Sequence, residues 1–257
     1  MTVRKIWIGG RTYDVTGEGY EPEGTILLEG RTVAFSEKPD LSHLCYVAAL
    51  DNKATLVPPL DRKKSRWTAL GDTTDAALLV LATKAGVSHK QLLNQNPRVG
   101  MIPFDSVRKM MTSIHKDDTG SVTAYVKGAG NEILSKCTTV YWDQHIVPIT
   151  EQLSHHIRTE IDALARQAYR VLALAIRALP NDLQKFESAT VETKMTFVGL
   201  VAIYDPPRHD VPSAVQKAQN AGIRIIMMTG DHELTAEAIA RRVGIITSKS
   251  YVVTTGY

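Results

Sequence analysis

The sequence predicts a mixed antiparallel α+β fold for residues 1–195 and a small parallel α/β unit for residues 196–257. Two observations indicate the first part: short β-type segments come in pairs joined by tight turns, and segments with helical spacing lie between the pairs. One observation indicates the second part. An unbroken apolar run, 197–203, and a second, mostly apolar run, 223–228, flank a helical segment, an order typical of a parallel βαβ unit.

The chain opens on a predicted β-hairpin. Val3–Ile8 and Arg11–Val15 are strand-like and are joined by the turn Gly9-Gly10. Leu41–Leu50 carries apolar residues at helical spacing. Together these segments predict a hairpin followed by a first helix.

A second helix is predicted from Asp72 to Gly86. Asp72 can cap its N-terminus, Asp75 lies in the first turn where the helix dipole favours an anion, and Gly86 suits the exit.

The middle of the chain predicts a second antiparallel pair, Ser106–His115 with Val122–Lys127, across a polar turn. Helices are then expected over 128–136 and 149–169. Residues 170–178 fit a strand or a helix, and the alternation of large and small side chains favours a strand. In the last part, helices are expected over 210–220 and 233–243.

The composition is that of an ordinary globular protein. The 257 residues carry a net charge of +3, with 22% charged and 44% hydrophobic residues, which excludes collagen-like and disordered chains. The basic clusters Arg62–Lys64 and Arg241-Arg242 are too short for a nucleic-acid stripe, so no nucleic-acid partner is expected.

Cysteine usage and apolar run length also exclude several classes. Cys45 and Cys137 lie far apart without a metal-binding pattern, which argues against a disulfide framework and a zinc site and favours a reducing compartment. No apolar run approaches the roughly 20 residues of a membrane-spanning helix. We therefore expect that this chain is not inserted in a membrane.

Thr229-Gly230-Asp231 follows the second apolar run and precedes a helix. A glycine and free amides at a helix N-terminus suit phosphate, and Thr229 can add a hydrogen bond. Asp231 could bind magnesium or cap the helix, and an ordinary capped helix is an equally acceptable interpretation.

Two further segments indicate a nucleotide. Lys127-Gly128-Ala129-Gly130 places a cation beside an amide-rich turn, although no GxxxxGK[ST] loop occurs in the chain. Phe104 lies close to Arg108-Lys109, which offers an aromatic face beside two cations. Taken alone, a phenylalanine is more often a core residue.

Together these segments resemble the cytosolic region of a type II P-type cation-transporting ATPase of the calcium-pump branch. Five motifs occur in the family's order. They are GDTTDAAL at 71–78, FDSVRKMM at 104–111, KGAGNEIL at 127–134, RVLALA at 170–175, and DPPR at 205–208 leading to TGD at 229–231. The resemblance covers essentially the whole chain, and 1–3 resemble residues that follow the family's DKTGTLT motif.

The resemblance implies an α+β nucleotide-binding domain over 1–195, a twisted antiparallel sheet flanked by helices. A partial α/β phosphorylation domain of the haloacid-dehalogenase-like, Rossmann-related type would follow over 196–257. It also implies that Phe104 stacks on adenine and that Lys127, in the KGA motif with Gly128, lines the adenine pocket. The other implied nucleotide residues are Lys109 and Arg170 as cations, Asp72 and Asp75 near the adenine amino group, and Ser106, which stands where some calcium pumps have Arg.

The implied mechanism is transfer of the γ-phosphoryl group of magnesium-ATP to an aspartate, which drives cation transport, with calcium favoured. Thr229, Gly230 and Asp231 form the implied phosphate loop. The implied partners are ATP, Mg²⁺ held mostly by residues outside this chain, and the transmembrane and actuator domains of a multi-pass pump. The implied location is the cytosolic face of a membrane.

The sequence departs from the family at the phosphorylated residue. No DKTGT motif occurs, Asp14 has only the D-x-T-G spacing, and the GDGxND magnesium motif is absent. We therefore expect a fragment without a metal site of its own that binds ATP without turnover, although its parent is an enzyme. Two alternatives are a free-standing haloacid-dehalogenase-like phosphatase, whose DxDx[TV] signature is absent, and a soluble nucleotide sensor.

Overall fold

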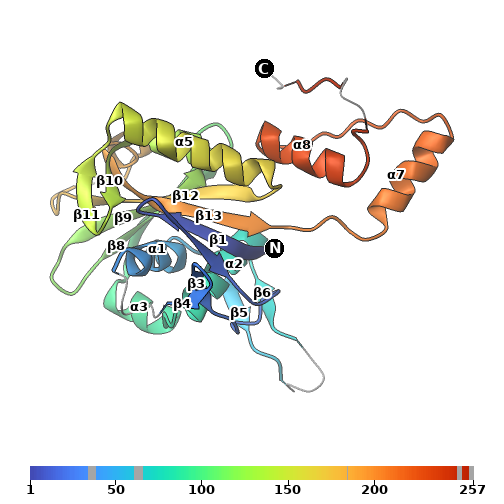
Figure 1. The fold of residues 1–257 in the computed structure, drawn as a ribbon. Coiled ribbons are helices and arrows are strands. Elements are labelled where there is room, and N and C mark those ends of the chain that lie inside the picture. Colours follow the sequence, from blue (N-terminus) through green and yellow to red (C-terminus); the bar gives the residue numbers. More distant parts are fainter. Residues whose placement is uncertain (34–38, 61–65, 184, 248–250, 255–257) are drawn as a thin grey trace.

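The computed structural model describes residues 1–257 apart from 34–38, 61–65, 184, 248–250 and 255–257. One large twisted sheet crosses the molecule, with helices on both faces (Figure 1). The strands are β1 Thr2–Ile8, β2 Arg11–Val15, β3 Ile26–Leu28, β4 Arg31–Thr32, β5 Thr55–Val57, β6 Thr68–Leu70, β7 Arg98–Asp105, β8 Met110–Lys116, β9 Val122–Ala129, β10 Cys137–Trp142, β11 His145–Pro148, β12 Arg170–Leu179 and β13 Met195–Tyr204. The helices are α1 Pro39–Leu50, α2 Thr73–Lys84, α3 His89–Gln95, α4 Gly130–Ser135, α5 Glu151–Arg166, α6 Ser188–Val191, α7 Val211–Asn220 and α8 Glu233–Arg242.

The main path of the sheet runs in the order β4-β3-β2-β1-β13-β12-β9-β8-β7, and neighbours along this path are antiparallel. The β10–β11 hairpin joins through β10, which runs parallel to β13. Strands β5 and β6 form a separate hairpin. The predicted α+β class with a large antiparallel sheet is confirmed.

Strand β13 lies at the centre of two hydrophobic layers. On one face Val198, Val201 and Ile203 pack in a core with α1 and α2, whereas Phe197 and Leu200 pack on the other face with α4 and α5. Successive side chains of a strand point to opposite faces, and both faces of β13 are covered by a core, so the residues on both faces are apolar. Burial on both faces therefore explains the unbroken apolar run.

Most predicted elements form where the pattern placed them, including the 3–8/11–15 hairpin, the 41–50 helix and the 170–178 strand. The strand expected from Ser106 begins only at Met110. Asp105 accepts hydrogen bonds from the amides of Val107 (3.0 Å) and Arg108 (2.8 Å), which fixes a turn before β8. Lys109 completes that turn with a φ of +53°.

The expected parallel pair of 197–203 with 223–228 is wrong for the described residues. Run 197–203 is strand β13, whose two long edges are taken by β1 and β12, and 223–228 forms no strand. An apolar run indicates burial on both faces but not the direction of its neighbours. β13 begins at the domain boundary expected near residue 195, so this position lies within the main sheet. The division of the chain there stays a prediction.

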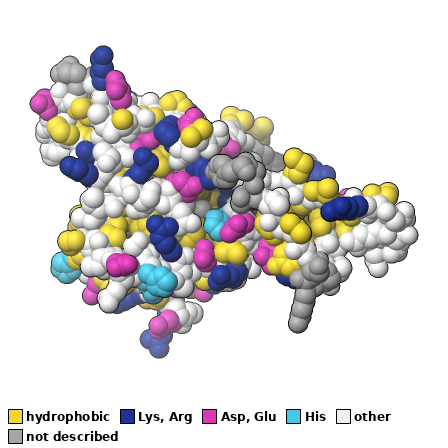
Figure 2. Space-filling model, turned by 90° about the horizontal axis from the view of Figure 1, so that it is seen from above, with side chains coloured by type: hydrophobic (Ala, Val, Ile, Leu, Met, Phe, Trp, Pro, Cys, Tyr) yellow, Lys and Arg dark blue, Asp and Glu magenta, His cyan; other side chains and the backbone are white. Residues whose placement is uncertain are grey.

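Surface charge is mixed in sign. On the face in Figure 2, Lys and Arg side chains lie among Asp and Glu side chains, and α7 projects to the right. Arg241 pairs with Glu237 (3.0 Å) and Arg242 donates to the hydroxyl of Tyr204 (2.7 Å), whereas the basic cluster 62–64 lies outside the described residues. Of the described helices, none combines the length and apolar character that crossing a bilayer takes.

Candidate functional site

A cleft of about 150 Å³ opens where β9 ends, β12 begins and α8 starts. It brings together six of the predicted site residues, which come from three separate motifs and the last helix start. They are Phe104, Lys109, Gly128, Arg170, Gly230 and Asp231. Ligand pockets commonly measure about 300–1,000 Å³, so this cleft is smaller than a typical enclosed ligand pocket.

Glycines shape the wall of the cleft. A Cβ on Gly128 would lie 2.4 Å from the carbonyl oxygen of Lys109, and one on Gly130 would lie 2.8 Å from Ile161 Cδ1. At Gly128 the close atom is backbone, so only glycine lets β8 approach β9 there, whereas at Gly130 a Cβ would require the Ile161 side chain on α5 to shift. These two positions explain the glycines of the KGAG segment by packing.

Phe104 and Lys109 line the cleft on the side of the β7–β8 turn. Phe104 lies near the end of β7 with 62% of its side chain exposed, so it is not a core residue. Lys109 Nζ lies 2.8 Å from Glu132 Oε1, which is also part of the lining. An exposed aromatic face beside a cation can stack on a base and attract a phosphate.

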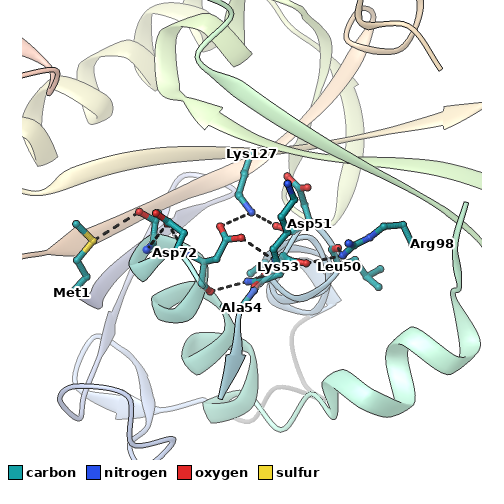
Figure 3. Close-up of polar contacts among 12 residues, drawn as sticks. Met1, Leu50, Asp51, Lys53, Ala54, Asp72, Arg98 and Lys127 are labelled. Atoms are coloured by element: carbon teal, nitrogen blue, oxygen red, sulfur yellow. Dashed lines mark hydrogen bonds and ion pairs between the residues drawn. The ribbon is translucent and has the colours of Figure 1, made fainter. Parts of the chain in front are cut away.

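Lys127 points to the opposite face of β9 from Gly128, as strand alternation requires. Its Nζ forms an ion pair with Asp75 Oδ1 (2.8 Å) and donates to the carbonyl oxygen of Asp51 (Figure 3). Both charged side chains are more than nine-tenths buried. The structure therefore brings Lys127 and Asp75 together, but Lys127 is not among the residues that line the cleft.

A polar turn after α1 frames this ion pair, and sequence reasoning missed it. Asn52 Nδ2 donates to the carbonyls of Ala48 (2.9 Å) and Asp75 (2.8 Å), while Arg98 donates to the carbonyl of Asn52 (2.6 Å). Lys53 contributes an amide hydrogen bond to Asp75 Oδ2 (2.9 Å). Most of these hydrogen bonds join residues that are far apart in the sequence. The segment itself, an apolar helix followed by one asparagine, has no spacing that would predict them.

Asp51 lies within the same frame, and its carboxyl is fully buried. Among the described groups, neither of its carboxyl oxygens has a hydrogen bond of ordinary length and angle, although the hydroxyl of Ser113 lies near enough to act against the rise in its pKa. Burial raises the pKa of Asp51 to about 7, although the nearby charge of Lys127 acts in the opposite direction. This carboxyl can therefore change its charge near neutral pH.

Asp72 caps α2 as predicted. Its carboxylate accepts hydrogen bonds from the amides of Thr74 (2.8 Å) and Asp75 (3.2 Å). Partial burial acts to raise the pKa of Asp72, but these hydrogen bonds and the charge of Arg170 outweigh it and lower that pKa. Arg170 thus lines the cleft and also acts electrostatically on the cap of α2.

The predicted phosphate loop is exposed at the start of α8. Thr229 Oγ1 donates to Asp231 Oδ2 (2.9 Å) and accepts from the amide of Asp231 (3.1 Å). The helix cap is His232, which accepts from the amide of Leu234 (3.4 Å), so the Asp231 carboxylate is not the cap. Gly230 and Asp231 line the cleft, whereas Thr229 and Ser106 do not.

The described residues hold no group of three His, Cys, Asp or Glu side chains placed to bind a metal ion. Asp231 is one carboxylate at the cleft. Mg²⁺ in phosphoryl-transfer sites is commonly held by one or two carboxylates together with phosphate oxygens, so this residue fits a magnesium-nucleotide.

Comparison with known proteins identifies the family. Residues 40–210 match the family described as P-type ATPase, cytoplasmic domain N. The chain is 34% identical over 95% of its length to a cation-transporting ATPase (pma1) of Synechocystis, and 34% identical over 94% to a calcium-transporting ATPase of Bacillus subtilis. It is also 31% identical over 96% of its length to a sodium/potassium-transporting ATPase α-4 subunit of the rat.

The chain spans about a quarter of the length of these relatives, covering 27%, 26% and 24% of them. The family match covers more than half of the chain and includes four of the five motifs in full, GDTTDAAL to RVLALA, together with the DPPR part of the fifth. The chain therefore belongs to the P-type ATPases, and residues 40–210 correspond to their cytoplasmic domain N.

Proposed function

We propose that the chain binds ATP as the nucleotide-binding part of a cation-transporting P-type ATPase. The adenine ring stacks on Phe104, and the phosphates extend past Lys109 and Arg170 toward Thr229-Gly230-Asp231. The observation that carries this proposal is the convergence of residues from separate motifs in one cleft. The aromatic face, the two cations and the loop at a helix start supply stacking, charge and amides in the order that a nucleotide needs.

Lys127 and Asp75 form the polar support beneath the base in this proposal. Lys127 directly precedes Gly128, which lines the cleft, and Asp72 lies within the electrostatic influence of Arg170. Their buried ion pair holds the end of β9 against α2. Ser106 lies in the exposed turn beside Phe104, at the adenine end of the proposed nucleotide, and does not line the cleft.

The wider role is proposed from the relatives. We propose that the phosphorylation-domain segment expected at the C-terminal end lies beyond the family match, in residues 211–257. We also propose that the chain lies on the cytosolic side of a multi-pass pump, and that Mg²⁺ accompanies ATP with Asp231 as one neighbour. The name of the Bacillus subtilis relative favours calcium as the cation. Because the DKTGT motif is absent from the 257 residues, the chain itself should hold ATP without transferring its γ-phosphate.

Calorimetric titration with ATP tests the binding proposal. Base stacking on an aromatic side chain contributes about 1–3 kcal/mol, so Phe104→Ala should weaken ATP binding about tenfold. Val107→Ala is the matched control, because Val107 is 86% exposed in the same turn and does not line the cleft. Equal affinity of wild type and Phe104→Ala contradicts the proposal.

Incubation with γ-labelled ATP tests the absence of turnover. The protein should carry no acid-stable label after prolonged incubation with magnesium. Stoichiometric labelling of the chain contradicts this part of the proposal and directs attention to Asp14 and the phosphatase alternative.

A further inference from the structure

The turn that presents Phe104 has few strand hydrogen bonds of its own. The pairing of β7 with β8 is irregular between Ile102 and Asp105, which is where Pro103 and Phe104 lie. Proline has no amide hydrogen to give to the ladder. Other contacts must therefore fix the backbone on which the exposed ring stands.

Arg108 supplies such a contact. Its Nη2 donates to the carbonyl oxygen of Pro103 (2.7 Å), the residue directly before Phe104. Its Nη1 forms an ion pair with the carboxylate of Glu192, which follows α6. One guanidinium thus joins the Phe104 turn to a distant part of the chain.

Glu192 is a firm anchor because it is buried and has a second partner. Its side chain is fully buried, and its Oε1 accepts from the hydroxyl of Thr112 on β8 (2.8 Å). A buried carboxylate without a cation is strongly unfavourable, so Arg108 is held in place by the cost of leaving Glu192 unpaired. The position of the Pro103 carbonyl is then set by the core of the domain.

We propose that Glu192, acting through Arg108, is a positioning residue that holds Phe104 in the orientation for stacking on a purine base. The inference rests on the proposed function. Holding a binding group in its bound conformation lowers the entropy lost on binding, so the ion pair raises nucleotide affinity without touching the ligand.

A double-mutant cycle with ATP as the titrant tests this inference. Glu192→Gln keeps the side-chain shape but removes the charge, and it should weaken ATP binding about fivefold when Phe104 is present. In a Phe104→Ala background the same change should alter ATP affinity less than about twofold, because no ring remains to be positioned. Glu237→Gln, which removes the negative charge of the partly exposed Glu237–Arg241 pair on α8, is the control and should leave affinity unchanged in both backgrounds.

Arg108→Lys is the second variant and carries the same cycle if Glu192→Gln does not fold. Lysine keeps the charge, but its single ammonium lacks the planar fork that serves Glu192 and Pro103 together, so the same loss is expected. Equal weakening by either variant in both Phe104 backgrounds, or no weakening in either, overturns the inference. If Phe104→Ala itself leaves ATP affinity unchanged, the proposed function fails and the inference falls with it.

Discussion

The two apolar runs of this chain show how differently similar sequences can end up in one molecule. Ile203, in strand β13, is fully buried between neighbouring strands, whereas Ile226 is 73% exposed in a segment without regular structure. Both belong to short runs rich in β-branched and other apolar residues. The difference teaches that an apolar run becomes a core strand only where free sheet edges and covering helices are available to it.

The largest expected effect compares these two isoleucines directly. Ile203→Ala should lower the free energy of unfolding by about 2–5 kcal/mol, because it leaves a cavity beside α1 and α2. Ile226→Ala should change it by less than about 0.5 kcal/mol. Urea unfolding followed by circular dichroism measures both, and equal losses would remove the contrast between the two regions.

A second prediction compares a buried acid with an exposed one. The native pKa of Asp51 is raised to about 7, so the folded state binds a proton that the unfolded state releases near pH 4. Stability from this group is therefore present below about pH 4 and is lost as the pH rises through about 7.

Asp51→Asn should remove this dependence. The free energy of unfolding of the variant, relative to wild type, should rise by about 3 kcal/mol between pH 4 and pH 7. Subtracting the two profiles removes the contribution of the histidines to the pH dependence of stability. Among them is His115, whose pKa is lowered by burial, so that its contribution increases stability as the pH rises. Glu18→Gln is the exposed control, because the Glu18 side chain is 85% exposed. Parallel wild-type and Asp51→Asn profiles would show that Asp51 does not titrate in this range.

The smallest expected effect compares two helix caps. Asp72→Ala removes two hydrogen bonds to amides of α2 and should lower the free energy of unfolding by about 1 kcal/mol. His232→Ala removes the single longer hydrogen bond at the start of α8 and should cost a few tenths of a kcal/mol by the same measurement. A larger loss at His232 would mean that α8 contributes more to global stability than its exposed surface indicates.

Local structure was well predicted from the sequence because its signals are local. The cap at Asp72, the Gly9-Gly10 hairpin and the strand at 170–178 depend on neighbouring residues, and all three are confirmed. The expected parallel pairing of 197–203 with 223–228 was wrong, because burial on both faces looks the same for parallel and antiparallel neighbours. Strand pairing is decided by residues far away in the chain.

The candidate site was predicted only in part for the same reason. The motifs supplied Phe104, Arg170 and Gly230, which the structure places in one cleft. Glu192 and Asn52 were missed, because the contacts that give them a role join residues distant in sequence and leave no local spacing. Residues that hold a site together are harder to find from sequence than residues that face a ligand.

The most direct test of the central claim is a titration of ¹⁵N-labelled protein with magnesium-ATP, followed by amide NMR signals. The amides of Phe104, Gly128, Arg170 and Gly230 should shift together along one binding curve. The amides of β3 and β4, at the opposite end of the main sheet from the strands of the cleft, should stay in place. Binding at one cleft predicts a single dissociation constant for all four. Saturating ATP that leaves these signals unmoved would contradict the account.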